Sequence, residues 1–354
     1  MKVRLPVRQA ILRRKTYEAP AEGRAGKIRL DFNENTTGCG QEVRRALAKL
    51  TAQELAMYPE YGEPTKRIAR KLAVRPEELL LTNGGDDALR VFFDTFVEPR
   101  SHILICEPTF PMYRYYAEIA GAEIAVCRYD EEQNFPLQDV LRGLKKKPRV
   151  FFLANPNNPT GTLVGASALR RILAAAPQTA VVLDEAYSDF SGFSATGWVR
   201  RYPNLFIART FSKAAGLAAL RLGAVIAKKE SLDMVRRAMP PFPVNLAALA
   251  AAEATLRDGR AIRAYVNKVK KLRAETTAAL RDMRVRVFPA AGNFLLADFG
   301  ASGPALFAKL ERKGILLRPR SKDMGPGYVR ITIGTEREMK TLLDEIARHW
   351  KGRA

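Results

Sequence analysis

The segment RTFSKAAGLAALRLG, residues 209–223, guides the interpretation of the whole chain. It places Lys213 beside the hydroxyl residues Thr210 and Ser212, with Arg221 eight residues further on. Hydroxyl groups and a guanidinium can bind one phosphate together, because arginine offers two parallel N–H donors. A lysine amine in the same place can bond covalently to a carbonyl group. The segment therefore predicts a phosphorylated cofactor that is held on Lys213.

Around this segment, short apolar runs alternate with amphipathic stretches. Runs rich in Val, Ile, Leu and Phe predict strands buried on both faces; they are Leu79–Thr82, Ile103–Cys106, Val150–Leu153, Ala180–Leu183, Leu205–Arg209 and Leu222–Ala227. Helical patterns lie between them, at Asp86–Phe96, Leu137–Leu144 and Ala166–Ala176. This alternation indicates an α/β domain with a mostly parallel sheet that is covered by helices.

The last third of the chain follows a different pattern. We expect a long helix from Ala247 to Met283, then short strands near Val285–Phe288, Phe294–Asp298, Ile315–Leu317 and Tyr328–Ile333, and a final helix from about Arg337 to Trp350. This α+β pattern predicts a second, smaller domain. The expected division is an N-terminal segment 1–40 that packs on the small domain or on a partner subunit, a large domain 41–246, and a small domain 247–354.

Polar residues follow several of the predicted strands. Asn158 comes after the strand near 150–153, Asp184 ends the next one, and Gly85 and Asp86 follow the strand at 79–82. Ligands in open α/β folds bind beyond the carboxyl ends of the strands, so we expect these residues and Lys213 to meet at one site. Free backbone N–H groups where the helix near 86 begins would stabilise a phosphate.

These motifs, in this order, resemble the histidinol-phosphate aminotransferase family of fold-type I enzymes, which use pyridoxal 5′-phosphate (PLP). The lysine segment is similar to the family pattern S-K-A-x-G-L-A-G-L-R-x-G, with Ala219 where glycine is frequent. The segments LTNGGDDALR (81–90), EPTFPMY (107–113), LANPNNPTG (153–161) and VVLDEAYSDF (181–190) match further motifs. The resemblance extends from about Tyr17 to the final helix. It implies a fold-type I transferase, with a mostly parallel seven-stranded sheet in the large domain.

The resemblance implies a role for each matching cofactor residue. Lys213 would carry PLP as a Schiff base and act as general acid and base, and Asp184 would pair with the protonated pyridine nitrogen. Asn158 and Tyr187 would contact the ring oxygen, and Phe110 would stack on the ring, where the family often has tyrosine. The phosphate would lie against Gly85, Asp86, Thr210, Ser212 and Arg221.

The resemblance also implies how the substrate and a partner subunit take part. Tyr58, in MYPEY, would reach the PLP phosphate of a neighbouring subunit, so a homodimer with shared sites is expected. Residues expected at the substrate are Tyr17, Asn33, Arg318 and Arg330. The arginine pair suits a carboxylate or a phosphate equally well. The implied reaction passes an amino group between a small-molecule donor and a keto acceptor: L-histidinol phosphate and 2-oxoglutarate give imidazole-acetol phosphate and L-glutamate.

Two other activities of the same fold stay open. An aromatic amino acid aminotransferase would use the same arginine for an α-carboxylate, and threonine-phosphate decarboxylases share the lysine motif. The net charge of +22 suggests a third possibility, a non-catalytic nucleic-acid-binding protein on a PLP fold. The basic residues are scattered and match no nucleic-acid-binding module, so a solvated basic surface is favoured and no specific nucleic-acid partner is expected.

The remaining composition bounds the environment of the protein. Three cysteines without recurring spacing, Cys39, Cys106 and Cys127, argue against a disulfide framework and against a metal site. No run of 18 or more apolar residues occurs, and the N-terminus lacks the pattern of a secretory signal, so no membrane span is expected. A reducing cytoplasm fits these features best.

Overall fold

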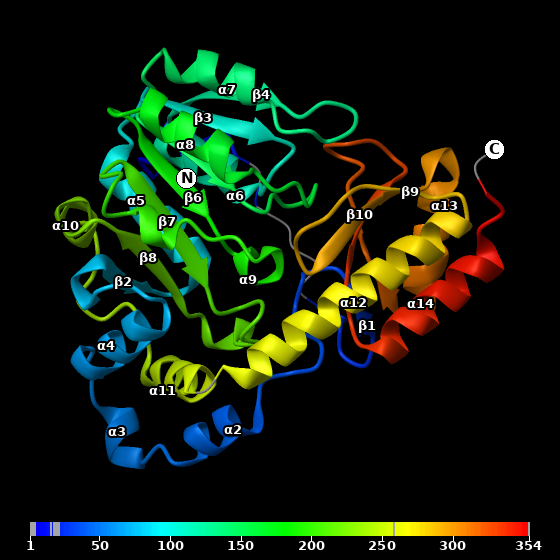
Figure 1. Ribbon diagram of the computed structural model, residues 1–354, viewed down its shortest axis with the longest axis horizontal. Helices are drawn as coiled ribbons and strands as arrows, with labels where there is room; N and C mark the ends of the chain where they lie inside the picture. Colours follow the sequence, from blue (N-terminus) through cyan, green and yellow to red (C-terminus); the bar gives the residue numbers. More distant parts are fainter. Residues whose placement is uncertain (1–4, 15, 17–21, 258, 353–354) are drawn as a thin grey trace.

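A seven-stranded sheet forms the centre of the computed structural model, which describes residues 5–14, 16, 22–257 and 259–352. Its strands are β2 (Leu79–Thr82), β3 (His102–Glu107), β4 (Glu123–Arg128), β5 (Val150–Ala154), β6 (Ala180–Asp184), β7 (Leu205–Thr210) and β8 (Gly223–Ala227). Their order is β2-β8-β7-β6-β5-β3-β4 (Figure 1). β4, β3, β5, β6 and β7 pair in parallel, whereas β8 runs antiparallel to both β2 and β7. The predicted mostly parallel sheet is confirmed.

Helices cover both faces of this sheet, which explains its continuous apolar strands. Every residue of β5 is buried. Phe151 and Leu153 point into a core closed by α7 (Leu137–Leu144) and α8 (Ala166–Ala175). Phe152 points to the opposite core, because successive side chains of a strand alternate between the faces. That second core is closed by α5 (Gly84–Phe96), α6 (Met112–Ala120) and α10 (Lys229–Arg236). Burying each large apolar side chain contributes about 1.5–3 kcal/mol.

The edge strand β4 was not among the predicted strands. Its sequence EIAVCR alternates between exposed and partly buried residues, and only Cys127 in it is buried. Among the described residues, β4 pairs only with β3 and forms one edge of the sheet. The run Ile124–Cys127 is apolar like those of the other strands, including the opposite edge strand β2, so the sequence carries the same signal for β4.

The C-terminal part of the chain forms smaller sheets. β9 (Arg286–Val287), β10 (Phe294–Asp298), β13 (Tyr328–Thr332) and β12 (Arg318–Pro319) make an antiparallel sheet of order β12-β13-β10-β9. The N-terminal strand β1 (Ile28–Arg29) pairs with β11 (Ile315–Leu316). α13 (Gly303–Arg312) and α14 (Glu336–His349) complete a separate apolar core. We propose the division into 1–40, 41–246 and 247–354, although residues 248–254 pack in the core of the large sheet, which favours a boundary after them.

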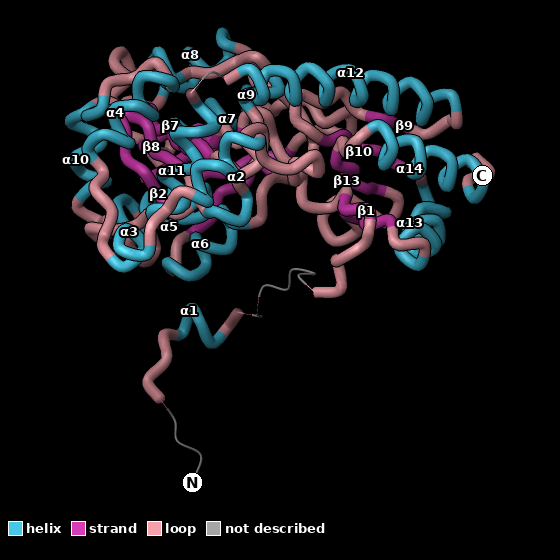
Figure 2. The backbone as a smooth tube through the Cα atoms, turned by 90° about the horizontal axis from the view of Figure 1, so that it is seen from below, coloured by secondary structure: helices cyan, strands magenta, loops and turns pink. Residues whose placement is uncertain are grey.

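The long helix expected from 247 to 283 is two helices, α11 (Leu246–Leu256) and α12 (Arg260–Asp282). Gly259, with φ at +66°, lies between them and has a backbone conformation that a helix does not allow. α12 runs from the large sheet to the small one (Figures 1 and 2). The other α-helices are α1 (Gln9–Leu12), α2 (Gln41–Ala48), α3 (Ala52–Ala56), α4 (Gly62–Lys71) and α9 (Ser188–Ser191). Within the described residues, no helix is both long and apolar enough to cross a bilayer.

Candidate active site

A cavity of about 400 Å³ is lined by residues from the carboxyl ends of the central strands. The predicted cofactor residues that line it are Gly85, Asp86, Phe110, Asn158, Asp184, Tyr187, Thr210, Ser212, Lys213 and Arg221. Phe32 and Glu34 add a wall from the N-terminal segment. The fold thus brings together residues from the N-terminal segment and from five further stretches of sequence, and the latter meet as the strand-end argument predicts.

Lys213 lies in the loop after β7, and its Nζ donates a hydrogen bond to the carbonyl oxygen of Phe32 at 2.9 Å. Burial lowers the pKa of Lys213 to about 8, and the neighbouring Arg330 cation acts in the same direction. A larger share of this amine is therefore neutral near physiological pH than in an ordinary lysine, and a neutral amine is the nucleophilic form.

Asp184 ends β6, and both of its carboxylate oxygens accept hydrogen bonds. Oδ2 accepts from the hydroxyl of Tyr113 at 2.7 Å, and Oδ1 accepts from the backbone N–H of Ala186 at 3.0 Å. Burial raises the pKa of Asp184, and these two hydrogen bonds oppose that shift. Tyr113 was not recognised from the sequence, although it lies only three residues after Phe110 in the motif EPTFPMY.

Arg330 connects the small sheet with this site. Its Nη1 donates to Asn158 Oδ1 at 2.6 Å, and its Nη2 donates to the carbonyl oxygen of Asp31. Because the oxygen of the Asn158 amide is occupied, its NH₂ group is the end that can act as donor in the cavity. Burial lowers the pKa of Arg330 to about 10. Arg318 is the register partner of Arg330 on β12, and its guanidinium carbon lies 5.7 Å from the centre of the Phe32 ring.

Asn33 lies behind the cavity and is not among the residues that line it. It is fully buried, and its Nδ2 donates to the hydroxyl oxygen of Tyr187 at 2.9 Å. Its Oδ1 accepts from Thr332 Oγ1 at 3.0 Å. Asn33 therefore helps to orient Tyr187, and its expected place close to the substrate stays a prediction.

The opposite end of the cavity is built around the start of α5. Arg221 Nη2 lies 3.3 Å from Asp86 Oδ2, and Thr210 Oγ1 donates to Ser212 Oγ at 3.0 Å. Gly84 has φ at +84°, and a Cβ atom there would lie 2.6 Å from Arg221 Nη2. Only glycine therefore leaves room for this guanidinium. The end of the cavity holds a cation, two hydroxyls and the N-terminus of a 13-residue helix, a donor set that suits a phosphate.

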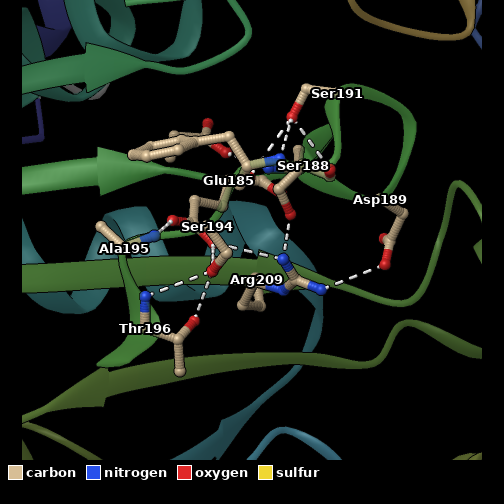
Figure 3. Close-up of polar contacts among 11 residues, drawn as sticks. Glu185, Ser188, Asp189, Ser191, Ser194, Ala195, Thr196 and Arg209 are labelled. Carbon is tan, nitrogen blue, oxygen red and sulfur yellow. Dashed lines mark hydrogen bonds and ion pairs between the residues drawn. The ribbon is translucent and has the colours of Figure 1, made fainter. Parts of the chain in front are cut away.

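A buried polar network lies beside these residues (Figure 3). Glu185, whose side chain has no exposed area, accepts from Ser194 Oγ at 2.6 Å, from the N–H of Ala195 at 2.7 Å and from Arg209 Nη1 at 3.2 Å. Arg209 also donates to Ser188 Oγ and, at 3.3 Å, to Asp189. The network joins the end of β7 to the turn after β6, and no motif in the sequence pointed to Arg209.

Among the described site residues, Arg318 and Arg330 are not part of the cavity lining, and Tyr58 lies away from it. The side chain of Tyr58 is exposed, with a relative exposure of 77% for the residue, and its ring stacks on Phe242 with centroids 4.3 Å apart. It does not line the cavity of its own chain. Tyr17 lies outside the described residues.

Comparison with known proteins relates this arrangement to one family. Residues 25–346 match the model of "Aminotransferase class I and II". The histidinol-phosphate aminotransferase of Anoxybacillus flavithermus is 34% identical over 340 residues, covering 92% of this chain and 89% of the relative. The histidinol-phosphate aminotransferase of Sinorhizobium meliloti, solved in complex with pyridoxal 5′-phosphate, aligns with a TM-score of 0.89 at 23% identity over 97% of each chain. L-Threonine-O-3-phosphate decarboxylase of Porphyromonas gingivalis aligns with a TM-score of 0.79 at 24% identity, covering 91% of this chain and 98% of the other.

Proposed function

The chain belongs to the class I and II aminotransferases, and within them to the histidinol-phosphate aminotransferase family. We propose that it transfers an amino group between L-histidinol phosphate and 2-oxoglutarate, with PLP carried on Lys213. The observation that carries the proposal is the meeting of Lys213, Asp184, Asn158 and Arg221 in one cavity. An amine, a carboxylate, an amide donor and a guanidinium are the four partners that the parts of PLP require.

The residues of the cavity fit PLP at both of its ends. Arg221, Thr210, Ser212 and the first turn of α5 would hold the phosphate, and Gly84 leaves the space that Arg221 needs. The donor group of Asn158 and the hydroxyl of Tyr187 would hold the ring oxygen, and Phe110 would cover the ring. When bound, PLP supplies an aldehyde that bonds to amines and a protonated pyridine ring that withdraws electrons from the reacting carbon.

Asp184 would keep that pyridine ring protonated. Its carboxylate is held by Tyr113 and Ala186, and a carboxylate accepts through about four lone-pair sites, so it can accept a further hydrogen bond from the ring nitrogen. A buried carboxylate without a cationic partner is costly, and an N–H⁺ group supplies that partner.

Lys213 would move the proton at the substrate carbon that carries the amino group. Its lowered pKa allows it to accept a proton near neutral pH and to return it on the neighbouring atom. Phe32 and Glu34, from the N-terminal segment, narrow the cavity on the Lys213 side and help to exclude water.

Arg330 and Arg318 would bind the anionic group of the substrate. They face each other across β12 and β13, and Arg330 is buried with its Nε unpaired among the described residues. Two neighbouring guanidinium groups suit a phosphate or a carboxylate, so the pair fits the phosphate of L-histidinol phosphate and a carboxylate of L-glutamate alike.

We also propose that the enzyme works as a homodimer in the cytoplasm. The dimer is supported by exposed apolar side chains beside Tyr58, namely Leu55, Met57 and Phe242, which a second copy could cover. In this arrangement Tyr58 would serve the site of the partner subunit. The cytoplasmic location is supported by the three free cysteines.

A substrate comparison tests the proposed reaction. Purified, PLP-loaded protein is given 2-oxoglutarate with L-histidinol phosphate or with L-phenylalanine, and L-glutamate is measured. We expect a much higher kcat/KM with L-histidinol phosphate. A preference for L-phenylalanine would move the protein to the aromatic aminotransferases, and carbon dioxide released from threonine phosphate would make it a decarboxylase.

A further inference from the structure

Tyr113, in α6, makes a contact with the candidate site that the family motifs do not assign. Its hydroxyl donates to Asp184 Oδ2 at 2.7 Å, the length of a strong charge-assisted hydrogen bond. Tyr113 is completely buried, and it does not line the cavity. Tyr113 therefore reaches Asp184 from the protein core and not from the cavity.

Packing holds the ring of Tyr113 in one place. It stacks on Phe152 with centroids 5.4 Å apart and planes 16° from parallel. It also meets the edge of Phe110, at 5.9 Å and 85°. Both neighbours belong to the core between α5, α6 and the sheet. Because the ring cannot turn without disturbing these contacts, its hydroxyl presents a fixed donor to Asp184.

The charged and titratable groups around Asp184 explain why this donor matters. Burial favours the neutral form of the carboxyl group, and the negative charge of Asp86 acts in the same direction. Tyr113, the N–H of Ala186 and the cation of Lys213 oppose them. The hydroxyl itself cannot ionise in this setting, because burial raises the pKa of Tyr113 well above its ordinary value. Tyr187, the other buried phenol nearby, bonds to Asn33 instead.

We propose that Tyr113 is a positioning residue for Asp184: it fixes the carboxylate in its ionised form, aimed at the nitrogen of the pyridine ring. This inference rests on the proposed function, since it concerns the same site and the same cofactor. Tyr113 touches neither the proposed cofactor nor the substrate, and it acts only through Asp184. Its loss should therefore change the protonation of the ring nitrogen and the catalytic step, and leave substrate binding unchanged.

Tyr113→Phe removes only the hydroxyl and keeps the ring contacts. The chain offers a matched control in Tyr129→Phe, since Tyr129 is also buried and its hydroxyl has no hydrogen-bond partner among the described residues. Each variant is loaded with PLP that carries ¹⁵N in the ring, and the ¹⁵N NMR shift reports whether that nitrogen is protonated. In both proteins the ¹⁵N signal should move toward that of a neutral pyridine as the pH is raised. We expect the midpoint of this change to lie at a lower pH in Tyr113→Phe than in wild type. Tyr129→Phe should follow the wild type.

Kinetics give an independent measurement on the same proteins. We expect kcat to fall about tenfold in Tyr113→Phe at unchanged KM for L-histidinol phosphate, as for the loss of one hydrogen bond to a charged group. In an Asp184→Asn background, Tyr113→Phe should shift the ¹⁵N signal no further, because the group through which it acts is gone. A ring-nitrogen titration equal to that of wild type and Tyr129→Phe would overturn the inference. The NMR measurement needs no substrate, so it separates a failure of this inference from a failure of the proposed reaction.

Discussion

Arg209 Nη1 lies 3.2 Å from Glu185 Oε2, and this ion pair joins the end of β7 to the turn after β6 (Figure 3). Glu185 directly follows Asp184, and Arg209 directly precedes Thr210. Asp184 and Thr210 both line the cavity. The pair therefore fixes the spacing between the strand end that carries Asp184 and the strand end that leads to Lys213.

Replacing Arg209 by glutamine should destabilise the protein strongly. The Glu185 side chain has no exposed area, so loss of its cation leaves a buried negative charge, at a cost of about 3–5 kcal/mol. Urea unfolding measures this loss. The control is Arg200→Gln, which removes a guanidinium paired with the buried Glu78. Because the side chain of Arg200 is half-exposed, we expect a smaller loss of unfolding free energy than in Arg209→Gln. A second change, Glu185→Gln, should recover part of the stability of Arg209→Gln. Equal losses in the two arginine variants would contradict this interpretation.

The amine of Lys213 should react with PLP at an unusually low pH. Burial lowers the pKa of Lys213 from 10.5 to about 8, so the neutral amine appears as the pH rises through about 8. The rate at which PLP bonds to the apo-protein should rise over that range and level off above it. Stopped-flow absorbance measures the rate, with Nα-acetyl-lysine as the reference amine. Since the cation of Arg330 also lowers the pKa of Lys213, Arg330→Gln should move the midpoint upward. A midpoint near that of the reference amine would refute the prediction.

An alanine at position 84 should weaken PLP binding. The added Cβ would lie 2.6 Å from Arg221 Nη2, so the guanidinium would have to leave its place. We expect the Kd for PLP to rise about tenfold, the value of one lost hydrogen bond to a charged group. Gly121→Ala is the control, because its φ is +72° and its nearest neighbours are 3.9 Å away. Both variants should lose about 1–2 kcal/mol of stability from the left-handed backbone. Normal PLP affinity in Gly84→Ala would exclude Arg221 from the phosphate site.

Mixing two inactive variants should restore activity if the sites are shared. In a dimer of Tyr58→Ala with Lys213→Ala, one site has both defects and the other has none. Activity of the mixture, after exchange of subunits, should clearly exceed the sum of the two separate proteins. Mass photometry confirms that mixed dimers form. A mixture that stays at the sum would show that Tyr58 serves no neighbouring site.

The sequence predicted the central sheet because strands buried on both faces are apolar throughout. The prediction missed the edge strand β4, although its residues Ile124–Cys127 form an apolar run and only its burial alternates. The break at Gly259 was also missed, because the sequence on both sides of this glycine is helical. Patterns of apolar residues predict which segments are buried, but they do not show where a helix is interrupted.

The cavity residues were predictable where a motif places polar residues at a strand end, as with Lys213 and Asp184. Contacts between residues of two different motifs could not be predicted from the sequence. Tyr113 reaches Asp184 over 71 positions of sequence, and Arg209 reaches Glu185 over 24. Asn33 was recognised, but its position behind Tyr187 depends on how β13 brings Thr332 against it. Such pairings are decided by tertiary packing, which local sequence does not encode.

The most direct test of the central claim is a single-turnover titration. PLP-loaded protein is mixed with L-histidinol phosphate and no keto acid, and the loss of the visible absorbance of the lysine-bound cofactor is followed. We predict rapid conversion of one equivalent of PLP per site to pyridoxamine phosphate, slow conversion with L-phenylalanine, and none with Lys213→Ala. A wild-type protein that gains no visible absorbance with PLP, or that keeps it unchanged with every amino donor, would contradict the account.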